Sequence, residues 1–181
     1  MASEREPHLV RGVVAGAIGG LVASWVMNVF MEDAGPKIQQ AAETITGQPH
    51  QSAGKGEKDD EPKEDATMKA ADAVVSTVTG GRHLSFEQKQ KGGPVVHYAF
   101  GAAMGALYGG LAEYSPAARA GFGTAFAAAL FAVADLWAVP ALHLSGSSKD
   151  APVSSLATPL SAHLVYGATT ESVRRLVSAA L

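Results

Sequence analysis

Long stretches without a charged side chain constrain this sequence more than any other feature. The first runs from Gly12 to Met31, 20 residues bounded by Arg11 and Glu32. A bilayer core of about 30 Å takes about 20 mostly apolar residues in a helix, because backbone polar groups cannot stay unpaired in lipid. Further runs follow at 94–112, at 120–144 (interrupted by Asp135) and, more diluted, at 151–170. The pattern predicts an all-α membrane protein, a bundle of four transmembrane helices.

Composition agrees with this interpretation. Apolar residues make up 47% and charged residues only 17%, a low charge content for a soluble domain, although a soluble Ala/Gly-rich helical bundle is the alternative. The first run is too long for a signal peptide and has Glu4 and Glu6 upstream, so we expect a retained span. The net charge of -3 gives no basic excess, which argues against nucleic acid as a partner. Cysteine is absent, which excludes disulfides and thiol nucleophiles.

The charges gather between the first two runs, which divides the chain into three parts. Residues 1–32 form a tail and the first span, 33–93 an extramembrane loop, and 94–181 the second to fourth spans. Within the loop, 54–65 is a charge-dense, solvated linker without an apolar residue to bury. Short amphipathic helices are expected on either side, at 36–47 and 64–80, because Pro opens the first, acids open the second, and Gly ends both. They lie on the membrane surface, cover the bundle, or are amphipathic turns in a solvated loop.

Basic residues near the span ends predict the orientation. One side carries Arg5, Arg11, Arg119, Arg174 and Arg175, whereas outside the long loop only Lys149 falls on the other. The positive-inside rule then places both termini in the cytoplasm and the long loop outside.

Glycines recur four residues apart on two of the spans. The second span carries Gly101, Gly105 and Gly109, and the first carries Gly12, Gly16 and Gly20, continued by Ser24. The third has Gly121, Ala125 and Ala129 at this spacing, and the fourth has Gly167. Small residues at this spacing let helix backbones approach closely in lipid. We expect these seams to be helix–helix contacts.

Polar residues interrupt the apolar spans at two depths. In the predicted orientation Asn28, His97, Asp135 and His163 lie in the outer half of the bilayer, and Glu113, Glu171 and Arg175 near its inner face. Glu171 and Arg175 are one helical turn apart and can pair. Ionisable groups in spans usually face the bundle interior. The outer group is therefore a candidate site, with interhelical hydrogen bonding by neutral histidines as the plainer alternative.

No P-loop, dinucleotide fingerprint, HExxH or GxSxG motif is present, so we predict no enzyme activity and no cofactor. Three functions are left open. The favoured one is a structural or accessory membrane component, in a homo-oligomer or a larger complex. A proton or ion pathway would use the outer His/Asp group above Glu113 and Glu171. A haem or metal binder would use His97 and His163.

Four segments together resemble a known family. They are "RGVVAGAIGGLVASWVMNVF", "HYAFGAAMGALYGGLAE", "ADLWAVPALHLSG" and "AHLVYGATTESVRRL", which cover all four runs in order but not the charged loop. The chain is similar here to the YagU-like bacterial inner-membrane proteins, a domain family of unknown function. The resemblance implies a bacterial inner-membrane location and supplies no catalytic residue, ligand or reaction.

Overall fold

The computed structural model describes residues 7–47, 64–144 and 152–181, and these residues form helices and no strand. Most of the predicted linker at 54–65 lies outside the described residues, as do Arg5 and Lys149. The expectation of an all-α chain is confirmed for the part that the structure describes.

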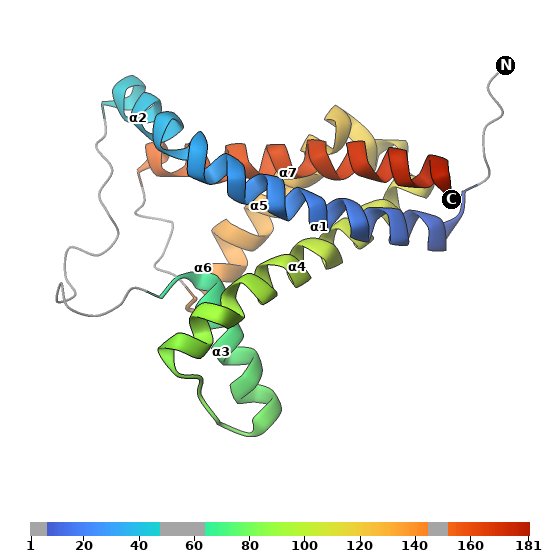
Figure 1. Ribbon diagram of the computed structural model, residues 1–181. Coiled ribbons are helices and arrows are strands. Elements are labelled where there is room, and N and C mark those ends of the chain that lie inside the picture. The colour runs from blue at the N-terminus through green and yellow to red at the C-terminus, as the bar shows by residue number, and fades with distance from the viewer. Residues whose placement is uncertain (1–6, 48–63, 145–151) are drawn as a thin grey trace, which may run out of the picture. The chain divides into compact units, whose positions relative to one another are not determined.

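Nine helical segments follow one another in the described residues (Figure 1). The long ones are α1 (Leu9–Asp33), α4 (Phe86–Tyr114) and α7 (Val153–Ala180). The shorter ones are α2 (Gly35–Thr46), α3 (Ala66–Thr79), the 3₁₀ segment η1 (Pro116–Gly123), α5 (Thr124–Val133), the π-helical turn η2 (Ala134–Ala138) and α6 (Val139–Ala141).

Three stretches of the described chain are long and apolar enough to cross a membrane: Leu9–Asp33, Phe86–Tyr114 and Pro116–Ala141. They correspond to the first three predicted spans. Helix α7, which holds the predicted fourth span, is not among them. Its sequence explains why, because Pro159, several hydroxyl groups and the charges at its C-terminal end lower its hydropathy. The fourth span stays a prediction.

Capping residues set the bounds of the two short helices between α1 and α4. Helix α2 has Pro36 in its first turn and ends at Gly47, which adopts a left-handed φ of 64°. Helix α3 begins after Asp65, whose side chain accepts a hydrogen bond of 2.8 Å from the backbone N–H of Met68. It ends at Gly80, with φ 73°. Both helices stop where a residue without a Cβ allows the left-handed turn.

Helix α4 begins at Phe86, eight residues before the predicted start of the second span at Pro94. A capping box explains the earlier start. The N–H of Gln88 donates to Ser85 Oγ at 3.3 Å, and the N–H of Ser85 donates to Gln88 Oε1 at 3.0 Å. The Ser-x-x-Gln signal is visible in the sequence, but the uncharged run alone does not reveal it. Pro94 is tolerated inside the helix.

The third uncharged run is not one regular helix. Gly121, Phe122 and Gly123 have left-handed φ values of 58°, 57° and 84°, so the chain turns before α5 begins. The predicted helical seam through Gly121, Ala125 and Ala129 is therefore wrong at Gly121. Further along, residues 134–138 form a π-helical turn around Asp135. Pro140, which has no N–H and crowds the carbonyl four residues earlier, gives a physical reason for the widened turn.

The chain divides into two compact units, each with its own core. Unit 1 comprises Met1–Phe30, Tyr98–Ala129 and Ala162–Leu181, and unit 2 comprises Met31–His97 and Leu130–Ser161. The core of unit 1 contains small side chains and two tyrosines: Ala15, Ala23, Tyr108, Ala112, Ala127, Ala162 and Tyr166. The core of unit 2 contains Met68, Ala71 and Phe131.

Candidate functional site

Charged side chains from three helices meet in unit 1. Arg11 lies in the first turn of α1, Glu113 at the end of α4, and Glu171 and Arg174 in the C-terminal half of α7. Arg11 Nη2 lies 3.1 Å from Glu113 Oε2, and Arg174 Nη1 lies 3.5 Å from Glu113 Oε1. The backbone N–H of His8 also donates to Glu113. These contacts tie the start of α1 and the end of α4 to α7.

Glu171 is the centre of this cluster, and its side chain is fully buried. Its carboxylate accepts hydrogen bonds from Tyr108 Oη at 2.8 Å, from Arg174 Nε at 2.7 Å and Nη2 at 3.1 Å, and from Arg175 Nε at 2.6 Å. A buried carboxylate is costly unless it is paired and hydrogen-bonded. Here four donors satisfy it, so Glu171 holds the surrounding side chains in fixed positions.

The side chain of Arg175 extends from this cluster to the surface. Its guanidinium carbon lies 4.6 Å from the ring centroid of Phe122, and its side chain is 53% exposed. Glu113, Glu171 and Arg175 are the three charged groups that the sequence predicts at one end of the bundle, and the structure brings them together. Tyr108 and Phe122 were not among the expected site residues. Arg174 was not expected either, although its position three residues after Glu171 is a sequence signal for an ion pair on one helix face.

The glycine seams of α1 and α4 lie against each other, also within unit 1. A Cβ added at Gly16 would lie 2.8 Å from the Cα of Gly109, and one at Gly105 would lie 2.7 Å from the Cα of Gly20. Gly12 faces Gly109 and Glu113, and Gly101 faces Ser24 and Gly20. In Figure 1 the two helices cross in this region. The backbones approach too closely for any side chain.

Gly167 of α7 makes a similar approach to a different partner. A Cβ at Gly167 would lie 2.6 Å from the Cβ of Ala127 and 3.0 Å from the carbonyl carbon of Gly123. The hydroxyl of Tyr166 donates to the carbonyl oxygen of Gly101 at 2.6 Å. Gly123 replaces the predicted Gly121 as the close-approach glycine of this region.

The four polar residues predicted in the outer half fall into the two units. In unit 1, Asn28 Nδ2 lies 3.5 Å from the hydroxyl of Tyr98, and His163 is buried in α7. In unit 2, Asp135 lies in the π-helical turn and His97 in α4. The cluster of all four residues would extend over both units, and it stays a prediction.

An unexpected neighbour of His97 is Asp65, the N-cap of α3. Burial opposes ionisation of the Asp65 carboxyl, but hydrogen bonds from the Thr67 hydroxyl and the Met68 N–H lower its pKa, and His97 acts in the same direction. The start of α3 also packs on this part of α4, because a Cβ added at Gly93 would lie 2.9 Å from Thr67 Oγ1.

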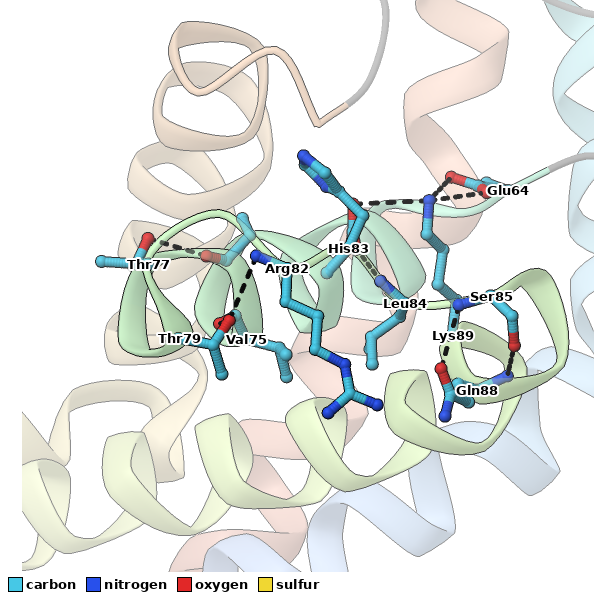
Figure 2. A network of polar contacts seen from close by, with 12 residues as sticks. Glu64, Val75, Thr77, Thr79, Arg82, His83, Leu84, Ser85, Gln88 and Lys89 are labelled. Carbon is cyan, nitrogen blue, oxygen red and sulfur yellow. Dashed lines mark hydrogen bonds and ion pairs between the residues drawn. The ribbon is translucent and has the colours of Figure 1, made fainter.

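A second polar network closes the hairpin of α3 and the first turns of α4 in unit 2 (Figure 2). Asp72 Oδ1 accepts the backbone N–H of Leu84 at 2.6 Å, and Oδ2 lies 2.9 Å from His83 Nδ1 and 3.4 Å from Lys89 Nζ. Lys89 also donates to Glu64 at 3.0 Å. The backbone contact, followed by His83, lowers the pKa of Asp72 from 3.8 to about 2.

The hairpin also has close helix contacts that the sequence analysis missed. A Cβ at Gly92 would lie 3.0 Å from the Cβ of Ala71, and one at Gly93 would lie 3.2 Å from Met68 Cγ. Adjacent glycines followed by a proline favour a loop, yet Gly92 and Gly93 lie inside α4. The capping box at Ser85 starts this helix before the two glycines.

Within residues 7–47, 64–144 and 152–181, no group of three or more His, Asp or Glu side chains could hold a metal ion. The alternative of haem or metal binding through His97 and His163 involves one residue from each unit and stays a prediction.

Comparisons with known proteins give one family. Neither the curated proteins nor the solved structures contain a match to the chain. A family model described as "Protein of unknown function (DUF1440)" matches residues 68–172. This range includes α4, the whole segment from η1 to α6 and most of α7. Because it covers more than half of the 181 residues, the chain belongs to the DUF1440 family of proteins of unknown function.

Proposed function

We propose that this protein is a small integral membrane protein with a structural or accessory role, and that it is not an enzyme. The observation that carries the proposal is the exposure of large apolar side chains along the candidate spans. Val10 is 64% exposed, Trp25 59%, Val95 68%, Leu107 50% and Trp137 69%. In water so much exposed apolar surface would drive association, whereas lipid tails solvate it.

The contacts inside unit 1 support the proposal. Association of helices in lipid depends on van der Waals packing and on polar contacts, because apolar side chains gain nothing by leaving lipid for one another. The facing glycines of α1 and α4 allow close van der Waals packing, and the Glu171 cluster supplies polar contacts between helices. The role that fits them is to hold a helix assembly together, as a homo-oligomer or within a larger membrane complex.

The proposed location is the bacterial inner membrane, as in the YagU-like proteins that the sequence resembles. The proposed topology has four spans, with α7 as the fourth, and both termini in the cytoplasm. The described arginines Arg11, Arg119, Arg174 and Arg175 would then all lie at the cytoplasmic face.

A proton or ion pathway is the second candidate, and one observation favours it. Asp135 lies in a π-helical turn inside the candidate span Pro116–Ala141. Such turns occur frequently at functional sites, and carboxylates within spans often mark ion routes.

Proton flux in proteoliposomes distinguishes the two candidates. The full chain is reconstituted with a pH-sensitive dye inside the vesicles, and a pH step is applied outside. A structural or accessory role predicts the same decay for the wild type, the Asp135→Asn variant and empty vesicles. A faster decay that Asp135→Asn abolishes would refute this role and support the pathway.

A further inference from the structure

Arg175 combines a fixed orientation with unused hydrogen-bond donors. Its Nε donates to buried Glu171 at 2.6 Å, and its guanidinium lies over the ring of Phe122. No hydrogen bond from its Nη atoms to another described residue is present, and the side chain is 53% exposed. The planar group is therefore held on one edge and presents its other donors outward.

The charges around Arg175 sum to a net positive charge. Among the described residues the cluster contains three arginines and two glutamates, and both glutamate side chains are buried. Arg119 adds a second exposed cation without an ion pair among the described residues. It precedes Phe122 by three residues, so their Cα atoms lie within about 11 Å of each other. An anion at Arg175 would meet positive charge and no exposed carboxylate of the cluster.

The cluster also lies at the ends of two candidate spans. Arg11 is in the first turn of α1 and Glu113 is next to the last residue of α4, and both belong to the ion-pair network of Arg174. The ends of the spans are the depth at which lipid phosphates lie in a bilayer. Phe122, which is 43% exposed, adds an apolar surface beside the guanidinium.

We propose that Arg175, assisted by Arg119, binds the phosphate of an anionic phospholipid. A guanidinium fork matches phosphate oxygens with two parallel N–H donors. Because Glu171 and Phe122 already fix the side chain, little conformational freedom is lost on binding. This inference rests on the proposed membrane location and gives that location a specific lipid partner.

Native mass spectrometry of the full chain in detergent tests the site. The probe is dioleoyl phosphatidylglycerol, and dioleoylglycerol, which lacks the phosphate, is the lipid control. Arg175→Gln should weaken phosphatidylglycerol binding by about tenfold, as expected for the loss of a charged hydrogen-bond donor. Arg82→Gln makes the same change at an exposed arginine of unit 2 and should leave binding unchanged.

Each other outcome has a defined meaning. Equal binding by wild type and Arg175→Gln, or equal binding of dioleoylglycerol, would overturn the proposal. Full displacement of the lipid by inorganic phosphate at the same concentration would also overturn it, because the site would then be one for free anions. If Arg175→Gln loses its helical circular dichroism, Arg175→Lys and Arg119→Gln replace it, and both should weaken binding. A chain that does not sediment with membranes would refute the proposed function itself, whereas a membrane-bound chain with unchanged lipid affinity would refute only this site.

Discussion

Replacing Gly105 with alanine adds one methyl group where two backbones meet. Its Cβ would lie 2.7 Å from the Cα and 2.8 Å from the N of Gly20, and closer still to the carbonyl oxygen of Gly16. Carbon atoms at van der Waals contact are about 3.5–4.0 Å apart, so α1 and α4 would have to separate. Overpacking of this kind costs about 1–3 kcal/mol. At about 2–4 °C per kcal/mol for a chain of this size, the unfolding midpoint should fall by roughly 2–12 °C.

Gly110→Ala is the matched control on the same helix. There the added Cβ would meet only side-chain methyl groups, Leu9 Cδ1 and Val13 Cγ2, each at 3.3 Å. Both variants gain about 0.8–1.0 kcal/mol from replacing glycine with alanine in a helix. Gly110→Ala, which meets no backbone atom, should therefore be neutral or slightly stabilised, and the fall expected for Gly105→Ala is measured relative to it. The assay is thermal unfolding in one detergent, followed by tryptophan fluorescence. Equal midpoints for the two variants would refute the reasoning that the seam is a backbone contact.

Three further predictions concern the Glu171 cluster, the hairpin of α3 and α4, and the membrane topology. Glu171→Gln removes the carboxylate that pairs with Arg174 and Arg175, so it should lower the free energy of unfolding by about 3–5 kcal/mol, measured by thermal unfolding. Glu87→Gln, which removes an exposed ion pair with Lys91, is the control and should have almost no effect. Because the pKa of Asp72 is lowered from 3.8 to about 2, its contribution to stability is present above pH 4 and is lost as the pH falls toward 2. Asp72→Asn should therefore reduce the change of the unfolding midpoint with pH between about pH 4 and pH 2. The same pH dependence in wild type and variant would contradict the role of Asp72 in the hairpin. For topology, a cysteine at exposed Thr77 should react with an impermeant thiol reagent in intact cells, and a C-terminal fluorescent protein should fluoresce in the cytoplasm. Labelling of Thr77→Cys only after lysis would reverse the orientation, and a dark C-terminal fusion would show that α7 does not cross.

Local signals in the sequence account for much of the fold. Uncharged runs identify α1 and most of α4, and Pro36, Gly47, Asp65 and Gly80 bound the two short helices. These signals act within a few residues of chain, so they can be interpreted without knowing the tertiary structure. The start of α4 was missed although its capping box is equally local, because the charged residues around it suggested a loop.

Tertiary contacts could not be predicted in the same way. The four-residue spacing indicates which face of α1 and α4 is smooth, but not that Gly16 lies opposite Gly105 and Gly12 opposite Gly109. This antiparallel register depends on how the helices meet. Likewise, Tyr108 and Phe122 look like ordinary apolar residues of a span, and only the fold places them against Glu171 and Arg175. The left-handed conformation of Phe122, flanked by two glycines, has no strong signal of its own.

Flotation of membranes after alkaline extraction tests the central claim most directly. Membranes from cells that express the full chain are washed with carbonate at high pH, mixed into the bottom of a density gradient and centrifuged. An integral protein, with side chains such as Val10, Trp25 and Trp137 in lipid, should float with the membranes and leave them only when detergent is added. Protein that is released by carbonate, or that stays at the bottom of the gradient as an aggregate, would contradict the claim that these apolar helices are solvated by lipid.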